Sequence, residues 1–164
     1  MIRTLIIIFV GILFSILESA LLSFFPMEFI KPDLGLPFVL YAALFLSPPE
    51  ALVVAVVVGI SQEILSNAPH GTIVFSKVAV FLVTIFLRRK LYIESRYSFA
   101  YSCIIFMVFE SVLAILMGFF ARGDTNNILN ILVFLAPNAL FTGFASVLIL
   151  SFIDLLSRRF AERG

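Results

Sequence analysis

The sequence predicts an all-α integral membrane protein: a polytopic bundle of about six transmembrane helices that forms one domain over residues 1–164. Apolar residues make up 62% and charged residues 13% of the 164 residues, and the mean hydropathy is +1.18. Soluble domains are roughly 45–50% apolar and about 25% charged, so this chain has too few polar side chains to cover a water-exposed surface. The apolar runs are continuous rather than alternating, which favours helices over the strands of a membrane barrel. Six spans of about 20 residues would leave only roughly 40 residues for every loop and tail.

Charged and turn-forming residues divide the apolar sequence into six expected spans, which are residues 5–25, 34–47, 51–66, 72–87, 98–121 and 130–156. The first is the long apolar run that starts at Leu5. The second and third are separated only by Pro48-Pro49-Glu50. At 1.5 Å per residue they reach about 21 and 24 Å, short of a hydrocarbon core of about 30 Å. We therefore expect these two helices either to thin the bilayer locally or to be buried against their neighbours.

Two other features divide or bend the later spans. Residues 67–71 form the tight turn expected before the fourth span, because Pro69 interrupts a helix and Gly71 tolerates a positive φ. The sixth span contains Pro137, which is expected to kink it.

Basic residues are distributed unequally between the two sides of the expected bundle. With the amino terminus inside, the cytoplasmic ones are Arg3, Arg88, Arg89, Lys90, Arg96, Arg158, Arg159 and Arg163, and the outer ones are Lys31 and Arg122. This excess follows the positive-inside rule, and an even number of spans returns the carboxyl terminus to the cytoplasm. The predicted topology is N-in and C-in, with the arginines contacting lipid headgroups.

Four ionisable side chains fall within the expected spans: Glu18, Glu63, Lys77 and Glu110. Each costs about 2.5–3.5 kcal/mol on insertion scales if it stays near the bilayer centre, so we expect all four to face the bundle interior. Stripes of small residues, which let helix backbones approach closely, recur at four-residue spacing on or beside the same faces. These stripes are Gly11-Ser15-Ser19-Ser23 beside Glu18, Ala51-Ala55-Gly59 leading to Glu63, Glu110-Ala114-Gly118, and Ala139-Gly143 beside Asn138.

Glu63 and Lys77 are the expected ion pair. Glu63 precedes the turn at 67–71 by four residues and Lys77 follows it by six, so a helical hairpin places them at similar depth. The pairing would lower the cost of burying both charges and fix the helix register. The alternatives are a polar pocket for a small ligand or a proton path, and a role in docking a partner. Glu18 and Glu110 have no cation nearby in the sequence; they are either protonated or meet Lys77 or Asn138 in the fold.

Residues that would carry catalysis or hold a cofactor are scarce. His70 is the single histidine and Cys103 the single cysteine, so neither a metal centre nor a disulfide framework is expected. Serine is not accompanied by a nucleophile motif, and no phosphate-binding glycine loop occurs. A net charge of +1 excludes a nucleic-acid-binding surface. We expect a protein that is not an enzyme and binds no cofactor.

Two short motifs carry a family resemblance. Pro32-Asp33-Leu34 opens the second span, and Gly59-Ile-Ser-Gln-Glu63-Ile-Leu65 precedes a turn that ends in Gly71. In order and spacing, and over nearly the whole chain, this layout resembles the rod-shape-determining protein MreD family. The resemblance matches Pro32 and Asp33 to the family's Pro-Asp or Pro-Asn pair, and Gly59, Glu63 and Gly71 to its glycine, acid and turn glycine. Glu63 stands where the family more often has Asp, Asn138 resembles the polar position of the last span, and Lys77 has no evident counterpart.

The resemblance implies a non-enzymatic scaffold of the cell-elongation complex in the bacterial inner membrane, which regulates cell shape and peptidoglycan synthesis. The implied partners are the lipid bilayer, an MreC-like single-span protein and, through it, an MreB-like filament, RodA and penicillin-binding synthases. The family is also similar in architecture to the membrane subunits of energy-coupling-factor transporters, so the alternative is a subunit that binds a vitamin-like small molecule. The candidate structural or interaction residues are Glu18, Pro32, Asp33, Gly59, Glu63, Gly71, Lys77, Glu110, Asn138 and Gly143.

Overall fold

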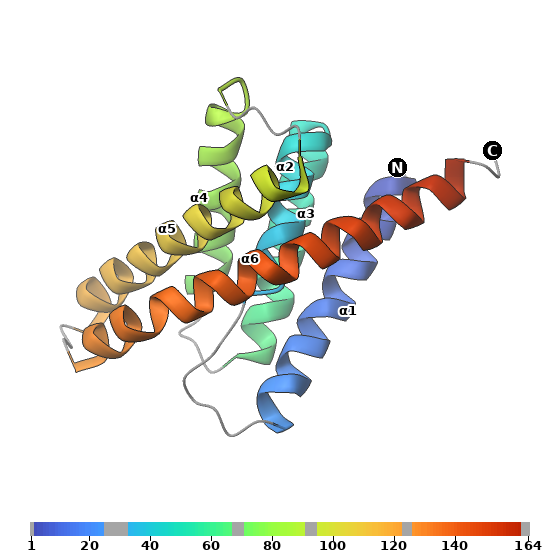
Figure 1. The fold of residues 1–164 in the computed structure, drawn as a ribbon. Helices are drawn as coiled ribbons and strands as arrows, with labels where there is room; N and C mark the ends of the chain where they lie inside the picture. The colour runs from blue at the N-terminus through green and yellow to red at the C-terminus, as the bar shows by residue number, and fades with distance from the viewer. Residues whose placement is uncertain (1, 25–32, 67–70, 91–94, 123–125, 162–164) are drawn as a thin grey trace.

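The structure is a computed structural model that describes residues 2–24, 33–66, 71–90, 95–122 and 126–161, and every regular element in them is a helix. Figure 1 follows the chain through α1 (Ile2–Phe24), α2 (Leu36–Phe45), α3 (Pro48–Leu65), α4 (Thr72–Leu87), α5 (Arg96–Arg122) and α6 (Asn126–Ala161). The all-α prediction is confirmed for this part of the chain. Expected span 72–87 coincides with α4.

Three segments within these helices are long and apolar enough to cross a membrane: Pro48–Leu65, Arg96–Met117 and Leu135–Ile153. Shorter apolar helical segments cover Thr4–Ala20, Leu36–Phe45 and Thr72–Leu87. The described helices therefore indicate an integral membrane protein, because about 20 apolar residues are needed to cross the hydrocarbon core as a helix. Crossing by all six helices stays a prediction.

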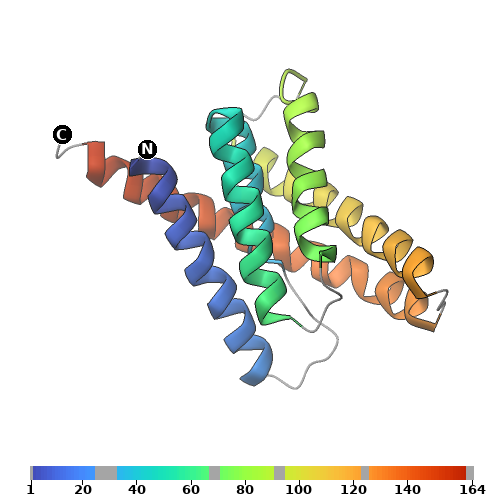
Figure 2. The same ribbon diagram turned by 180° about the vertical axis from the view of Figure 1, so that it is seen from behind.

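The helices fall into two groups by inclination. α1, α3 and α4 run nearly parallel or antiparallel to one another, whereas α5 and α6 lie side by side and are strongly inclined across them (Figures 1 and 2). The beginning of α1 and the end of α6 lie at the same end of the bundle (Figure 1). The beginning of α3 and the end of α4 lie at that end as well.

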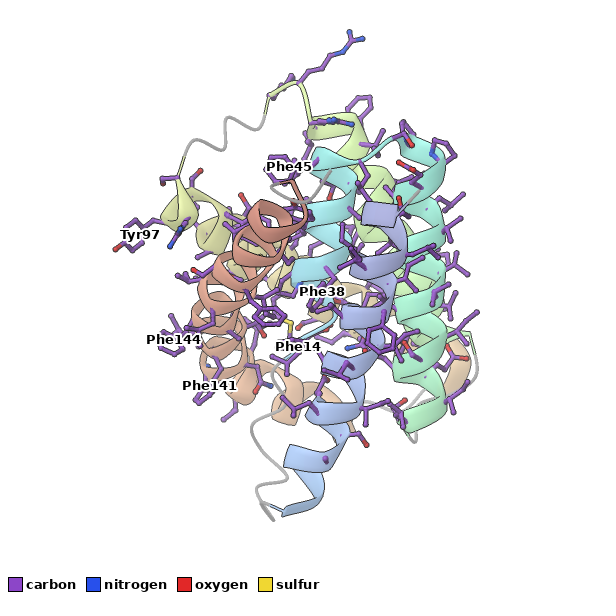
Figure 3. The ribbon with its side chains drawn as sticks, turned by 90° about the vertical axis from the view of Figure 1, so that its right-hand side faces the viewer. Phe14, Phe38, Phe45, Tyr97, Phe141 and Phe144 are labelled. Atoms are coloured by element: carbon purple, nitrogen blue, oxygen red, sulfur yellow. The ribbon has the colours of Figure 1, made fainter. Side chains whose placement is uncertain are left out.

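The central element is the short helix α2. Residues 36–44, nine of its ten, are buried, and it contacts each of the other five helices. A helix that is apolar all round is stable only where neighbours cover every face. Its ten residues reach about 15 Å, roughly half a hydrocarbon core, so this helix is shorter than the span expected at 34–47. Of the two outcomes expected for that span, burial against its neighbours is the one observed. Phe38 points into the bundle toward Phe14 of α1, with ring centroids 5.4 Å apart (Figure 3).

The expected connection Pro48-Pro49-Glu50 is instead the first turn of α3. Proline suits this position because its fixed φ is helical and its missing N–H would have no partner there. The N–H and the hydroxyl of Ser47 both donate to Glu50 Oε2, at 3.4 and 2.7 Å, which closes the turn. Glu50 Oε1 also accepts a hydrogen bond from Thr4 Oγ1 at 3.0 Å, and this joins the beginnings of α1 and α3.

The helices α5 and α6 extend beyond the expected spans at 98–121 and 130–156. α6 continues as a helix through Pro137, as proline is tolerated in membrane helices whose neighbours satisfy the freed backbone groups. Gly143 permits the close packing of α5 against α6, since a Cβ at this position would lie 2.6 Å from Ile104 Cγ1. The outer face of α6 is apolar, and Phe141 and Phe144 point away from the bundle (Figure 3).

Candidate functional site

Six polar side chains, one from each helix or the segment just before it, gather inside the bundle. We call them the interior polar cluster: Glu18 of α1, Asp33 just before α2, Gln62 of α3, Lys77 of α4, Glu110 of α5 and Thr142 of α6. Hydrogen bonds and ion pairs join every member to at least one other. The cluster therefore connects all six helices through polar contacts inside the bundle.

Lys77 lies at the centre of the cluster. It is completely buried, and its Nζ forms ion pairs with Asp33 Oδ2 and with Glu110, whose Oε1 lies 2.8 Å away. The side chains of Asp33 and Glu110 are 14% and 13% exposed. The expected pairing of Lys77 with Glu63 is wrong, because both ion-pair partners of Lys77 come from distant segments. Glu110 makes the contact with Lys77 that was expected as one alternative.

Asp33 joins the beginning of α2 to the rest of the cluster through hydrogen bonds. Its Oδ1 accepts hydrogen bonds from the N–H of Leu36 and from Gln62 Nε2, both at 2.9 Å. Its own N–H donates to Thr142 Oγ1 at 3.0 Å. The first N–H groups of a helix lack intrahelical partners and carry partial positive charge, so a carboxylate is favoured there.

Gln62 and Glu18 form the second half of the cluster. Gln62 Nε2 donates to Glu18 Oε2 at 3.0 Å, and the N–H of Leu34 donates to the same oxygen at 3.1 Å. Gly35 leaves room for the amide, because a Cβ there would lie 2.7 Å from Gln62 Cδ, Nε2 and Oε1. Glu18 thus meets Gln62 and the segment before α2, and the described residues place no cation at hydrogen-bonding distance from it.

Gly59 sets how closely α3 and α4 approach. A Cβ at Gly59 would lie 3.0 Å from the backbone Cα of Val74 and 3.4 Å from Lys77 Cγ. Ala51 and Ala55 are fully buried on the same face. The predicted stripe of small residues on α3 is therefore a helix-packing surface that lets the Lys77 stem pass beside it.

Glu63 lies at the end of α3 and stabilises the beginning of α4. Its Oε1 accepts a hydrogen bond from the N–H of Gly71, and its Oε2 accepts one from the N–H of Val74 at 3.2 Å. Gly71 has a φ of +87°, the left-handed region that favours glycine, as the turn at 67–71 predicted. Residues 67–70 of that turn lie outside the described residues.

Replacing Glu63 with alanine is expected to destabilise the protein by about 1 kcal/mol, because two N–H groups at the start of α4 lose their acceptor. Thermal unfolding in mild detergent would measure the loss. Glu63→Gln is the matched control, since its amide oxygen still accepts one of the two hydrogen bonds and should recover part of the stability. Equal stability of Glu63→Ala and the parent would contradict this capping role.

The other sequence candidates lie near the cluster or outside the described residues. Asn138 is half-buried on α6, one turn before Thr142. Gly143 follows Thr142 and packs on α5. Pro32 lies outside the described residues.

Sequence reasoning missed three members of this region: Gln62, Thr142 and Gly35. Gln62 could have been found, since a side-chain amide within an apolar helix faces the same burial cost that singled out its neighbour Glu63. Gly35 and Thr142 carry no local signal, because their roles depend on which distant segments they meet.

The described residues contain no group of three or more His, Cys, Asp or Glu side chains arranged to hold a metal ion. Comparison of the chain with protein-family models, with curated proteins and with solved structures finds no match.

Proposed function

We propose that this protein is a non-enzymatic scaffold of the bacterial cell-elongation complex, embedded in the inner membrane as a six-helix bundle. The observation that carries the proposal is the division of polar and apolar groups. The interior polar cluster links all six helices through hydrogen bonds and ion pairs inside the bundle, whereas many large apolar side chains are exposed on its outside. A protein built this way presents helix faces and short helix ends to its partners.

The residues that carry the resemblance to the MreD family also support a structural role. Asp33 holds the start of α2, Gly59 sets the approach of α3 to α4, and Glu63 caps α4 beside Gly71. None of these roles requires a ligand or a reaction. The partners proposed on this basis are an MreC-like single-span protein, directly, and an MreB-like filament, RodA and penicillin-binding synthases through it.

The distribution of basic residues supports the N-in and C-in topology. Arg88, Arg89, Lys90 and Arg96 are exposed, and they follow α4 or begin α5 at the end of the bundle where α1 starts (Figure 1). Arginine and lysine are enriched on the cytoplasmic side and attract anionic headgroups.

The transporter-subunit alternative is less well supported. It requires Lys77 to line an open pocket, and Lys77 is fully buried between Asp33 and Glu110. A vitamin-like ligand of drug-like size would need several of these groups to face a shared cavity.

Site-specific photo-crosslinking in cells tests the scaffold and maps the face that binds the partner. A photoreactive phenylalanine analogue would replace Phe9 of α1, Phe86 of α4 or Phe144 of α6, which are 69%, 84% and 68% exposed. We expect one of these faces to capture an MreC-like protein together with wall synthases, while the other two serve as matched controls. Capture of a coupling subunit and ATPases instead would replace the scaffold with a transporter.

A further inference from the structure

The helices α3 and α4 share an exposed apolar surface. They lie side by side and antiparallel (Figure 2). We call their outer surface the α3–α4 face, and its exposed large side chains include Leu52, Val53, Ile60 and Ile64 of α3 and Phe75, Leu82 and Phe86 of α4. Because α3 is long and apolar enough to cross a membrane, α4, which runs back along it, covers the same depth. In a bilayer, acyl chains would cover this face.

The apolar length of the α3–α4 face is short. α4 has 16 residues, from Thr72 to Leu87, and the apolar part of α3 runs from Ala51 to Leu65. At 1.5 Å per residue these segments reach about 24 Å and about 22 Å, whereas a typical hydrocarbon core is about 30 Å thick. Any tilt of the two helices would shorten their reach further. The face is therefore about 6–8 Å shorter than the hydrocarbon around it.

Glu63 fixes one edge of the α3–α4 face. Its Oε1 accepts a hydrogen bond from the N–H of Gly71, and its Oε2 accepts one from the N–H of Val74. Both oxygens are thus bonded to the beginning of α4. The charge could extend toward the lipid headgroups only by breaking these hydrogen bonds, so it holds this edge at the level where α4 begins.

Arg88 fixes the opposite edge. Its Nη1 donates to the carbonyl oxygen of Leu46 at 3.1 Å, which holds the guanidinium at the level where α2 ends. Long charged side chains often relieve a short apolar length by extending to the interface, and this hydrogen bond opposes that extension. The next residues, Arg89 and Lys90, are exposed. Their charge complements anionic headgroups and places the phosphate layer at this edge.

We propose that the α3–α4 face binds phospholipids with short acyl chains and thereby thins the bilayer on this side of the protein. A short apolar length is accommodated by thinning, by extension of flanking side chains or by association with another protein. Hydrogen bonds at Glu63 and Arg88 oppose extension. A second copy, related by a two-fold axis along the membrane normal, would bring two like basic edges together, whereas lipid phosphates complement that edge.

Thinning would concentrate the protein in thin regions of the membrane, because hydrophobic mismatch sorts proteins by bilayer thickness. The inference rests on the membrane embedding in the proposed function and is independent of the partners proposed there.

Fluorescence quenching by lipid measures the preference of this face in the full-length protein. The chain contains no tryptophan, so Leu82→Trp introduces a single reporter on α4. Brominated phosphatidylcholine quenches a tryptophan that it contacts, and its displacement by a second lipid gives that lipid's relative binding constant. The competitors, in order of increasing chain length, are dimyristoleoyl-, dioleoyl- and dierucoyl-phosphatidylcholine. We expect the shortest lipid to bind about twofold or more tighter than dioleoyl-phosphatidylcholine, and the longest to bind weakest.

Leu140→Trp on α6 is the matched reporter. Leu82 and Leu140 are 58% and 65% exposed, but α6 has 36 residues and does not require a thin bilayer, so its reporter should show little dependence on chain length. Should Leu82→Trp fail to fold, Phe86→Trp places the reporter on the same face.

Moving the edge of the face provides a second test. Combining Arg88→Leu and Arg89→Leu in the Leu82→Trp protein lengthens the apolar run of α4 by about 3 Å and removes the hydrogen bond to Leu46. The preference should then shift toward dioleoyl-phosphatidylcholine. Arg122→Leu makes the same substitution at the end of α5 and should leave the preference at Leu82→Trp unchanged.

Three results would overturn the proposal. One is equal binding of the three lipids at Leu82→Trp, and another is an equally strong short-chain preference at Leu140→Trp, which would make it a property of the whole bundle. The third is quenching at Leu140→Trp but not at Leu82→Trp, which would show that protein, such as a second copy, covers the α3–α4 face. None of these affects the crosslinking test of the scaffold, which measures partner capture. Absence of quenching at both reporters would contradict the membrane embedding itself and so both proposals.

Discussion

Replacing Lys77 with methionine is expected to destabilise the folded bundle by about 3–5 kcal/mol. Lys77 is fully buried, and it is the ion-pair partner of both Asp33 and Glu110. Methionine keeps an unbranched chain one atom shorter than lysine but leaves the two carboxylates without their counter-charge. Removing one member of a buried pair costs this much because the remaining charge has lost its water and gained no partner. The loss would be measured as the fraction of monodisperse protein left after heating in mild detergent.

Lys90→Met is the matched control, since the same substitution is made at an exposed position after α4. It should change stability little. In the Lys77→Met background, Asp33→Asn and Glu110→Gln together should restore part of the lost stability by removing both unpaired charges. A Lys77→Met protein as stable as the parent would show that the ion pairs contribute nothing to the fold.

Replacing Gly59 with leucine is expected to destabilise the protein by about 3 kcal/mol or more, at the upper end of overpacking effects. A Cβ at Gly59 would lie 3.0 Å from the backbone Cα of Val74, so α4 as a whole must move to make room. That movement would draw Lys77 away from Asp33 and Glu110, whose positions depend on other helices. Packing and ion pairing would therefore be lost together, and so would capture of the scaffold's partners.

Two variants calibrate the Gly59 result. Val53→Leu enlarges a side chain that is half exposed on the outer face of the same helix, and it should leave both stability and partner capture unchanged. Gly59→Ala adds only the Cβ and should fall between Gly59→Leu and the parent. A stable Gly59→Leu protein with a normal yield of complex would contradict the close approach of α3 and α4.

Local features of the fold were predictable from the sequence alone. Continuous apolar runs with few charges require membrane helices, because only closed backbone hydrogen bonding is stable in hydrocarbon. The small residues leading from Ala51 to Gly59 predicted a packing face on α3, and Gly71 predicted a turn with positive φ. Each of these depends on neighbours within a few residues, so the pattern is visible in the chain itself.

The expected Glu63–Lys77 pair failed for an instructive reason. Both residues border one hairpin, and sequence distance suggested that they meet. The carboxylate of Glu63 found closer donors in the N–H groups at the start of α4, which have no intrahelical acceptor. Lys77, on the face of α4 that turns toward the interior, met Asp33 and Glu110.

The sequence by itself determined that this is a helical membrane protein, where its helices run within a few residues, and that Glu18, Lys77 and Glu110 face inward; Glu63, expected to do the same, instead caps α4 at the end of α3. Only the tertiary structure decided which charges meet, that α2 is a buried central helix, that Gln62 and Thr142 belong to the interior polar cluster, and that Gly35 packs against Gln62. The physical reason is that helical periodicity sets which residues share a face over three or four positions. Which faces then meet depends on the packing and inclination of helices that are distant in the chain: Lys77 is 44 residues from Asp33 and 33 from Glu110.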